Sequence, residues 1–122
     1  QEKIPAPKKA AKSLSEHHHA VVITRKGKTL VEQRGEDGMW AGMWQTPTVE
    51  HRRRLNEIQI QSALAVRVDR LLRSNDFKHI TTHRHIRFHV YCATSRSRRG
   101  IWKTRDELQE LPMSNAQRRV LS

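Results

Sequence analysis

FKHITTHRHIRFHVYCA, residues 77–93, contains the clearest β-strand pattern in this sequence. In its second half the apolar residues fall on every other position, at Ile86, Phe88, Val90 and Cys92. The positions between and before them carry His85, Arg87, His89 and Tyr91. Successive side chains of a strand point to opposite faces, so this alternation predicts a strand with the first set on the core and the second on a basic outer face.

Three further patterns lie upstream of this strand. Residues 19–24 (HAVVIT) and 29–33 (TLVEQ) are β-branched segments separated by a turn at Gly27, which predicts a β-hairpin. The tryptophan-rich segment 35–48 predicts a structured loop that packs on the core. Residues 55–72 space their apolar side chains by three, four and five positions, which predicts a helix.

Two short helical segments follow the strand. Thr104 is a candidate N-cap for a helix over 105–111, and Glu107 completes a capping box. Residues 115–121 suit a final turn or two of helix. The order of hairpin, loop, helix, strands and short helices predicts an α+β domain in which helices flank a small mixed β-sheet.

The domain organisation follows from composition. Residues 1–16 (QEKIPAPKKAAKSLSE) combine prolines and lysines with little to bury, which predicts a basic Pro/Lys linker. Residues 17–122 are then one folded domain, because a chain of this length has room for a single core. Gln1 opens the chain without a start Met, so we expect it to be part of a longer protein.

The chain is strongly basic. Its 24 Lys and Arg residues against 12 Asp and Glu residues give a formal charge of +12. Such a surplus predicts a polyanionic partner, and nucleic acid ahead of an anionic membrane, because neutralised phosphates release condensed counterions. No apolar run approaches the ~20 residues of a spanning helix, so no membrane partner is expected. The single cysteine, Cys92, suggests a reducing intracellular compartment, which we expect to be the cytoplasm.

Three blocks and a linker occur in an order known from one protein family. They are LVEQRGEDGMWAGMWQTPTVE (30–50), FKHITTHRHIRFHVY (77–91), IWKTRDELQELPMSNAQRRVL (101–121) and IPAPKK (4–9). Together they cover most of the chain, which resembles the C-terminal, Nudix-like domain of MutY-type adenine DNA glycosylases. The resemblance implies an α/β/α sandwich.

The resemblance also implies a role in DNA repair. Enzymes of this family remove adenine paired with 8-oxoguanine in base-excision repair, and this domain binds the damaged double-stranded DNA and reads the lesion base. The glycosylase chemistry belongs to a helical domain with a 4Fe–4S cluster on four cysteines, which one cysteine cannot hold. We therefore expect a non-catalytic, cofactor-free monomer, associated with the nucleoid and partnered by the catalytic domain of the same parent chain.

Lesion recognition falls, by the same resemblance, on His79, Thr81, Thr82 and His83. 8-Oxoguanine has a protonated N7 and a C8 oxygen, so a hydroxyl that both accepts and donates can read it. Thr82 occupies the position of the family's serine and keeps the hydroxyl, whereas Thr81 replaces a phenylalanine wedge. His83 would orient the loop or contact a phosphate, and His79 would brace it. From residue type alone, an ordinary edge strand is the better explanation of this segment. The resemblance and the flanking charges favour recognition for Thr82 and His83, whereas for Thr81 and His79 the two explanations are even.

The candidate phosphate contacts are cations beside this loop and in an arginine run. They are Lys78, Arg84, Arg52, Arg53 and Arg54. Runs of this kind are often solvated faces, and in a chain of this charge we expect them to supply nonspecific affinity.

Two other functions remain open. A MutT-type Nudix hydrolase of 8-oxo-dGTP needs several carboxylates on a helix to hold Mg²⁺, but segment 47–74 offers only Glu50, Glu57 and Asp69. A nonspecific basic domain for nucleic-acid or protein interaction would bind DNA whether or not it carries the lesion. The histidines of 17–19 have no neighbouring Cys or carboxylate ligands in our interpretation, so no metal site is expected.

Overall fold

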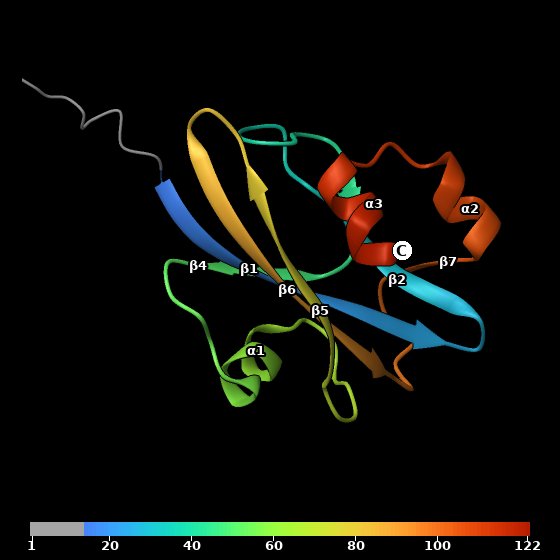
Figure 1. Ribbon diagram of the computed structural model, residues 1–122. Helices are drawn as coiled ribbons and strands as arrows, with labels where there is room; N and C mark the ends of the chain where they lie inside the picture. The colour runs from blue at the N-terminus through green and yellow to red at the C-terminus, as the bar shows by residue number, and fades with distance from the viewer. Residues whose placement is uncertain (1–13) are drawn as a thin grey trace, which may run out of the picture.

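Two long strands, β1 (Leu14–Arg25) and β6 (Arg84–Thr94), form the centre of the sheet. The computed structural model describes residues 14–122. In it, β1 and β6 pair in parallel along their length, from Leu14 opposite Arg84 to Thr24 opposite Thr94 (Figure 1). Strand β1 therefore begins inside the segment expected to be linker, and residues 1–13 of that linker lie outside the described residues.

The other strands extend this central pair into a mixed sheet. They are β2 (Lys28–Gln33), β3 (Trp44–Gln45), β4 (Thr48–His51), β5 (Leu72–Ile80) and β7 (Ile101–Lys103). The strand order is β3-β2-β1-β6-β5, with β4 paired to β1 and β7 paired to β2. The predicted hairpin is confirmed as β1–β2, and Gly27 adopts a φ of +76° in its turn. The α+β class with a mixed sheet is confirmed.

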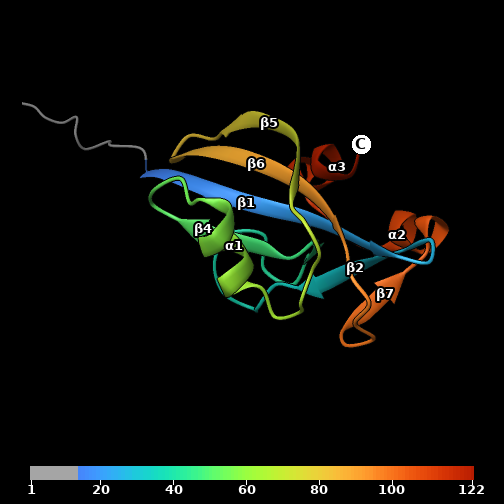
Figure 2. The same ribbon diagram turned by 90° about the horizontal axis from the view of Figure 1, so that it is seen from below.

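Two clusters of buried apolar side chains pack on opposite faces of the sheet. The cluster on the side of helix α1 (Glu57–Ala63) comprises Val21, Ile23, Leu30, Ile60, Val66, Leu71, Tyr91 and Ala93. The cluster on the side of α3 (Asn115–Leu121) comprises Ala20, Phe77, Ile86, Phe88, Val90, Ala116 and Val120. Figure 2 shows α1 and α3 on opposite sides of the central strands. We refer to the two faces as the α1 face and the α3 face.

The burial pattern of β6 corrects the predicted alternation in part. Ile86, Phe88 and Val90 are buried as predicted. His89 and Tyr91 were expected on an open outer face but are 2% and 3% exposed. The prediction assumed one covered face, whereas α1 and the chain after it cover the second face as well. Cys92, expected in the core, is exposed, and the cluster on the α3 face ends at Val90.

The long helix predicted over 55–72 is wrong. Helix α1 spans only Glu57–Ala63, with an Asn56–Gln59 capping box at its start, and Leu72 already belongs to β5. Leu71 is buried as the spacing predicted, whereas Val66, which does not fit that spacing, is also buried. Both lie in an irregular segment whose Asp69 N–H donates to the carbonyl of Thr94 at 2.9 Å. Their spacing therefore reflects separate contacts with the core and not one helical stripe.

The C-terminal helices are confirmed. Helix α2 (Arg105–Glu110) begins with the predicted capping box, in which Thr104 and Glu107 exchange hydrogen bonds. Helix α3 follows an N-cap at Ser114. Trp40 packs partly buried against the cluster on the α3 face, as the loop prediction required. None of the helices in the described part of the chain is long and apolar enough to cross a membrane.

Neutral histidines join the central strands on the α1 face. His19 Nδ1 donates to the Val49 carbonyl at 2.9 Å, and its Nε2 accepts from the Leu55 N–H at 2.9 Å, which fixes one neutral tautomer. His89 stacks between His19 and His17, at centroid distances of 5.0 and 5.1 Å. Burial is the main cause that lowers the pKa of His89 to about 4, and it also lowers the pKa values of His17 and His19.

Acid should therefore destabilise the fold. The unfolded chain takes up these protons near pH 6.5, whereas folded His89 stays neutral down to about pH 4. The folded state then binds fewer protons, so stability is complete above pH 6.5 and falls as the pH drops from 6.5 towards 4. Urea unfolding at pH 7 and at pH 5 measures this loss, and His89→Phe should reduce it. Equal free energies of unfolding at the two pH values would contradict the prediction.

Candidate nucleic-acid interface

The hairpin of β5 and β6 ends in a tip at residues 81–83. Its backbone is closed by Thr81, whose N–H donates to the Arg84 carbonyl at 2.9 Å and whose hydroxyl oxygen accepts from the Arg84 N–H at 3.0 Å. A threonine hydroxyl used in this way replaces a backbone carbonyl and stabilises the turn. Thr81 is therefore a turn residue, and the exposed Thr82 and His83 form the apex.

His79 packs within the protein and is not part of the exposed apex. Its ring is half-buried on the α3 face, 5.5 Å from the Trp40 ring and 6.5 Å from the Phe88 ring. Burial lowers the pKa of His79, and the positive charge of Arg119 lowers it further. A neutral imidazole in this position braces the base of the hairpin against the loop that carries Trp40.

Arg84 is committed to an ion pair within the protein. Its guanidinium contacts the carboxylate of Glu16, which also hydrogen-bonds His18 Nε2 at 2.8 Å. The contact holds the start of β1 against the hairpin tip. Among the predicted phosphate contacts, Arg84 therefore has the least free charge to offer a ligand.

The α1 face of the hairpin carries cations on adjacent strands. Lys78 pairs across the strands with Arg87, and Arg87 pairs with His17. Like charges directly opposite each other destabilise a sheet. Among the ion pairs of residues 14–122, none involves Lys78 or Arg87. An arrangement that costs stability and has no acidic partner is typical of a surface that binds an anion.

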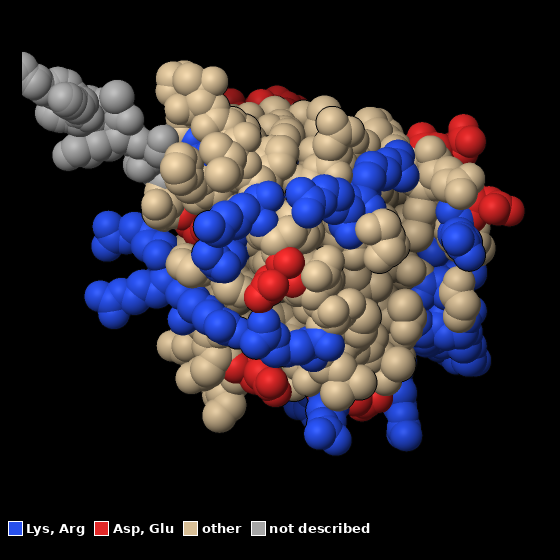
Figure 3. Space-filling model, viewed as in Figure 1, with Lys and Arg blue, Asp and Glu red and all other residues tan. Residues whose placement is uncertain are grey.

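The arginine run approaches the same surface. Arg52, Arg53 and Arg54 lie exposed between β4 and α1. His17 lies opposite Arg87 on β6 and opposite His51 on β4, three residues before Arg54. After burial, the positive charges of Arg87 and Arg54 lower the pKa of His17. We call Lys78, Arg87 and Arg54 the cationic surface. Figure 3 shows Lys and Arg side chains spread over the face presented by β5, with few Asp or Glu among them.

Two further residues of this region had no place in the predicted site. Arg119 lies with its guanidinium carbon 4.0 Å from the centroid of the Phe77 ring, on the α3 side of the hairpin. Ile80 is 61% exposed at the end of β5. The arginines at 96, 98 and 99 follow the opposite end of β6, whose 11 residues extend about 35 Å. They therefore lie far from the hairpin tip.

Carboxylates do lie beside the histidine run, contrary to our interpretation of the sequence. Glu16 and Glu50 each direct one oxygen towards His18 Nε2, at 2.8 and 3.7 Å, and the three groups could surround a metal ion. The second oxygen of each carboxylate contacts an arginine, Arg84 for Glu16 and Arg34 for Glu50. An arginine contacts each carboxylate, so in this structure the cluster is a network of ion pairs.

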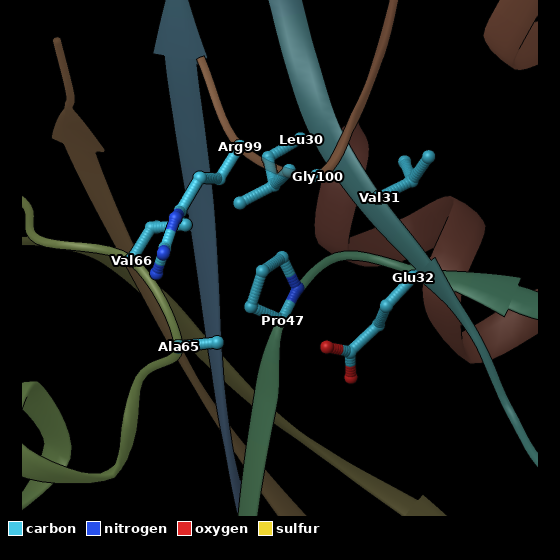
Figure 4. A pocket seen from close by; sticks show the side chains of 8 residues that line it. All are labelled: Leu30, Val31, Glu32, Pro47, Ala65, Val66, Arg99 and Gly100. Carbon is cyan, nitrogen blue, oxygen red and sulfur yellow. The ribbon is translucent and has the colours of Figure 1, made fainter. Parts of the chain in front are cut away.

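Helix α1 and the cavity beside β2 do not supply a Mg²⁺ site. Helix α1 carries one acid, Glu57, in its first turn. A cavity of about 470 Å³ opens between β2 and the segment after α1, and Figure 4 shows Pro47 at its centre with Arg99 and Glu32 on either side. Glu32 is its one acidic lining residue, whereas Mg²⁺ on a diphosphate is usually held by several carboxylates.

Comparisons with known proteins agree on the fold. The NUDIX domain family model matches residues 18–122. The C-terminal domain of mouse MUTYH, solved in complex with human PCNA, is 20% identical with a TM-score of 0.61, over 87% of this chain and 84% of that one. A MutT NUDIX hydrolase from Burkholderia pseudomallei is 21% identical with a TM-score of 0.69, over 88% and 95%. A search of the curated proteins finds no match.

Removal of the Thr81 hydroxyl should loosen the hairpin tip. Thr81→Ala deletes the acceptor of the Arg84 N–H, and a hydrogen bond of this kind contributes about 0.5–1.5 kcal/mol, so exchange of the Arg84 amide should accelerate roughly two- to tenfold. Thr81→Ser keeps the acceptor and should preserve the slow exchange. Hydrogen exchange followed by NMR measures both variants. Identical Arg84 rates in Thr81→Ala and the parent chain would show that the hydroxyl does not hold the turn.

Proposed function

Because this chain belongs to the Nudix domain family, we propose that it is the lesion-recognition module of a MutY-type adenine DNA glycosylase. It binds double-stranded DNA and recognises 8-oxoguanine opposite adenine. The observation that carries the proposal is the exposed Thr82–His83 apex next to the cationic surface. The similarity of fold to the mouse MUTYH domain supports it.

In this proposal the cationic surface binds phosphates and the hairpin apex recognises the lesion. Lys78, Arg87 and Arg54 hold phosphates, which position the domain on the duplex without reading sequence. The Thr82 hydroxyl accepts from N7–H of the lesion or donates to O8, two groups that guanine lacks. Because the Thr81 hydroxyl is used by the turn, Thr82 is the threonine of the pair that is free to read a base.

The rest of the enzyme completes the proposed function. Adenine removal belongs to the catalytic domain and its 4Fe–4S cluster, which we assign to the remainder of the parent protein. The module itself then works as a non-catalytic monomer on nucleoid DNA. Its role is to add lesion-dependent affinity to the catalytic domain, because the module senses the 8-oxoguanine strand while the adenine is removed from the other strand.

The Thr82 hydroxyl should account for preference between duplexes. Thr82→Val removes the hydroxyl at nearly constant shape, so affinity for an 8-oxoguanine:adenine duplex should fall about two- to tenfold, the value of one hydrogen bond. Affinity for the guanine:adenine duplex should stay unchanged. Fluorescence anisotropy titrations with both duplexes at two salt concentrations measure the difference.

A matched variant separates recognition of the lesion from binding of the phosphates. Arg54→Ala should weaken binding to both duplexes alike and lower the slope of log affinity against log salt by about one. If the unsubstituted 122-residue chain binds both duplexes with equal affinity, and the affinity depends on salt alone, the chain is a nonspecific basic domain and the lesion-reading proposal fails.

Hydrolysis of 8-oxo-dGTP in the manner of MutT is the second candidate. The observation that favours it is the group of Glu16, His18 and Glu50, whose ligand atoms lie close enough to hold a cation. Incubation of the chain with 8-oxo-dGTP and Mg²⁺ tests it directly. Rapid pyrophosphate release that Glu50→Gln abolishes would replace the lesion-reading proposal with this one.

A further inference from the structure

A hollow of about 370 Å³ opens beside the hairpin tip. Five of its lining residues come from neighbouring strands and carry the argument: His17, Lys78, Ile80, His85 and Arg87. We call this feature the hairpin hollow. Lys78 and Ile80 are two residues apart on β5, and their cross-strand partners on β6 are Arg87 and His85. The four side chains therefore point to the same face of the sheet, the α1 face.

Ile80 is the unusual residue of the hairpin hollow. It is 61% exposed, and its cross-strand neighbour is His85. The next cross-strand pair on the same face is Lys78 with Arg87. Single exposed apolar residues are common on protein surfaces, so exposure alone carries no conclusion. What distinguishes Ile80 is its place in a hollow that Lys78 and Arg87 also line, because this combination matches a ligand with one anionic and one apolar part.

The acidic residue at the hollow does not oppose an anion. Glu16 also lines it, but its two carboxylate oxygens contact Arg84 and His18. Lys78 and Arg87 have no such partner among residues 14–122. The local charge available to a ligand is therefore positive.

We propose that the hairpin hollow binds one nucleotide of a DNA strand, with its phosphate on Lys78 and Arg87 and its base against Ile80. The base must unstack at least in part to contact this side chain, as bases do where other proteins insert an isoleucine or leucine between base steps. The inference rests on the proposed function, since it assumes that the hairpin approaches a duplex. It adds a second contact that lies one residue before the Thr81 turn and takes a nucleotide next to the lesion.

Duplexes with 2-aminopurine test the assignment, because this base fluoresces more strongly when it unstacks. The probe is placed in turn at each position that flanks 8-oxoguanine, and the duplex is titrated with the 122-residue chain. We expect a rise at one position, its loss in Ile80→Ala, and about fivefold weaker affinity of that variant for the duplex. Leu72→Ala should behave as the parent chain, because Leu72 is 54% exposed at the other end of the same strand.

The outcomes separate this inference from the proposed function. Duplex binding without a rise at any position, or with a rise that Ile80→Ala retains, would overturn the nucleotide assignment and leave lesion reading intact. Absence of duplex binding by the unsubstituted 122-residue chain would overturn both the nucleotide assignment and the proposed function. A third arm uses free 2-aminopurine deoxyribonucleoside monophosphate. Ile80-dependent binding of this nucleotide that excess unlabelled duplex fails to displace would identify a free nucleotide as the ligand and contradict the DNA-strand assignment.

Discussion

The parallel pairing of β1 with β6 is the constraint on which the rest of this structure depends. It places 11 residue pairs in register and sets the start of β1 beside the hairpin tip. Because the pairing begins at Arg84, the ion pair of Arg84 with Glu16 forms at the end of the ladder. One end of the central sheet thus carries the hairpin apex, the start of β1 and the β4–α1 loop. The other end carries the arginines at 96, 98 and 99.

The distribution of acids then decides which cations remain available. Glu16 and Glu50 are used by Arg84 and Arg34, so these arginines support the protein and not a ligand. Lys78 and Arg87 stay on the α1 face as cross-strand neighbours. The net charge of +12 therefore does not distinguish two kinds of basic residue. One kind is neutralised within the network of ion pairs around His18, and the other faces solvent at the hairpin.

The sequence carried enough information for the elements with strong local signals. The capping box of Thr104 and Glu107 marked α2, and alternation marked the apolar side of β6. Local signals failed where distant segments decide the outcome. After α1 ends at Ala63, the Asp69 N–H pairs with the distant Thr94 carbonyl, and the burial of His89 depends on the chain that covers a second face of the sheet.

The candidate site shows the same limit. The segment from His79 to His83 could be singled out through family resemblance, but the different uses of the two threonine hydroxyls depend on the geometry of the turn. The neighbourhood of Lys78, Arg87 and Arg54 depends on strand register, which no single segment encodes. Nothing in the sequence marks Ile80, because its 61% exposure depends on how the folded sheet is covered.

The central claim is that DNA approaches the hairpin end of the sheet. NMR amide shifts of the labelled chain, recorded during titration with an 8-oxoguanine:adenine duplex, test this claim most directly. The account predicts the largest changes at residues 78–87 and 52–54 and negligible changes at 96–99. Changes concentrated at 96–99, with the hairpin tip unaffected, would contradict it.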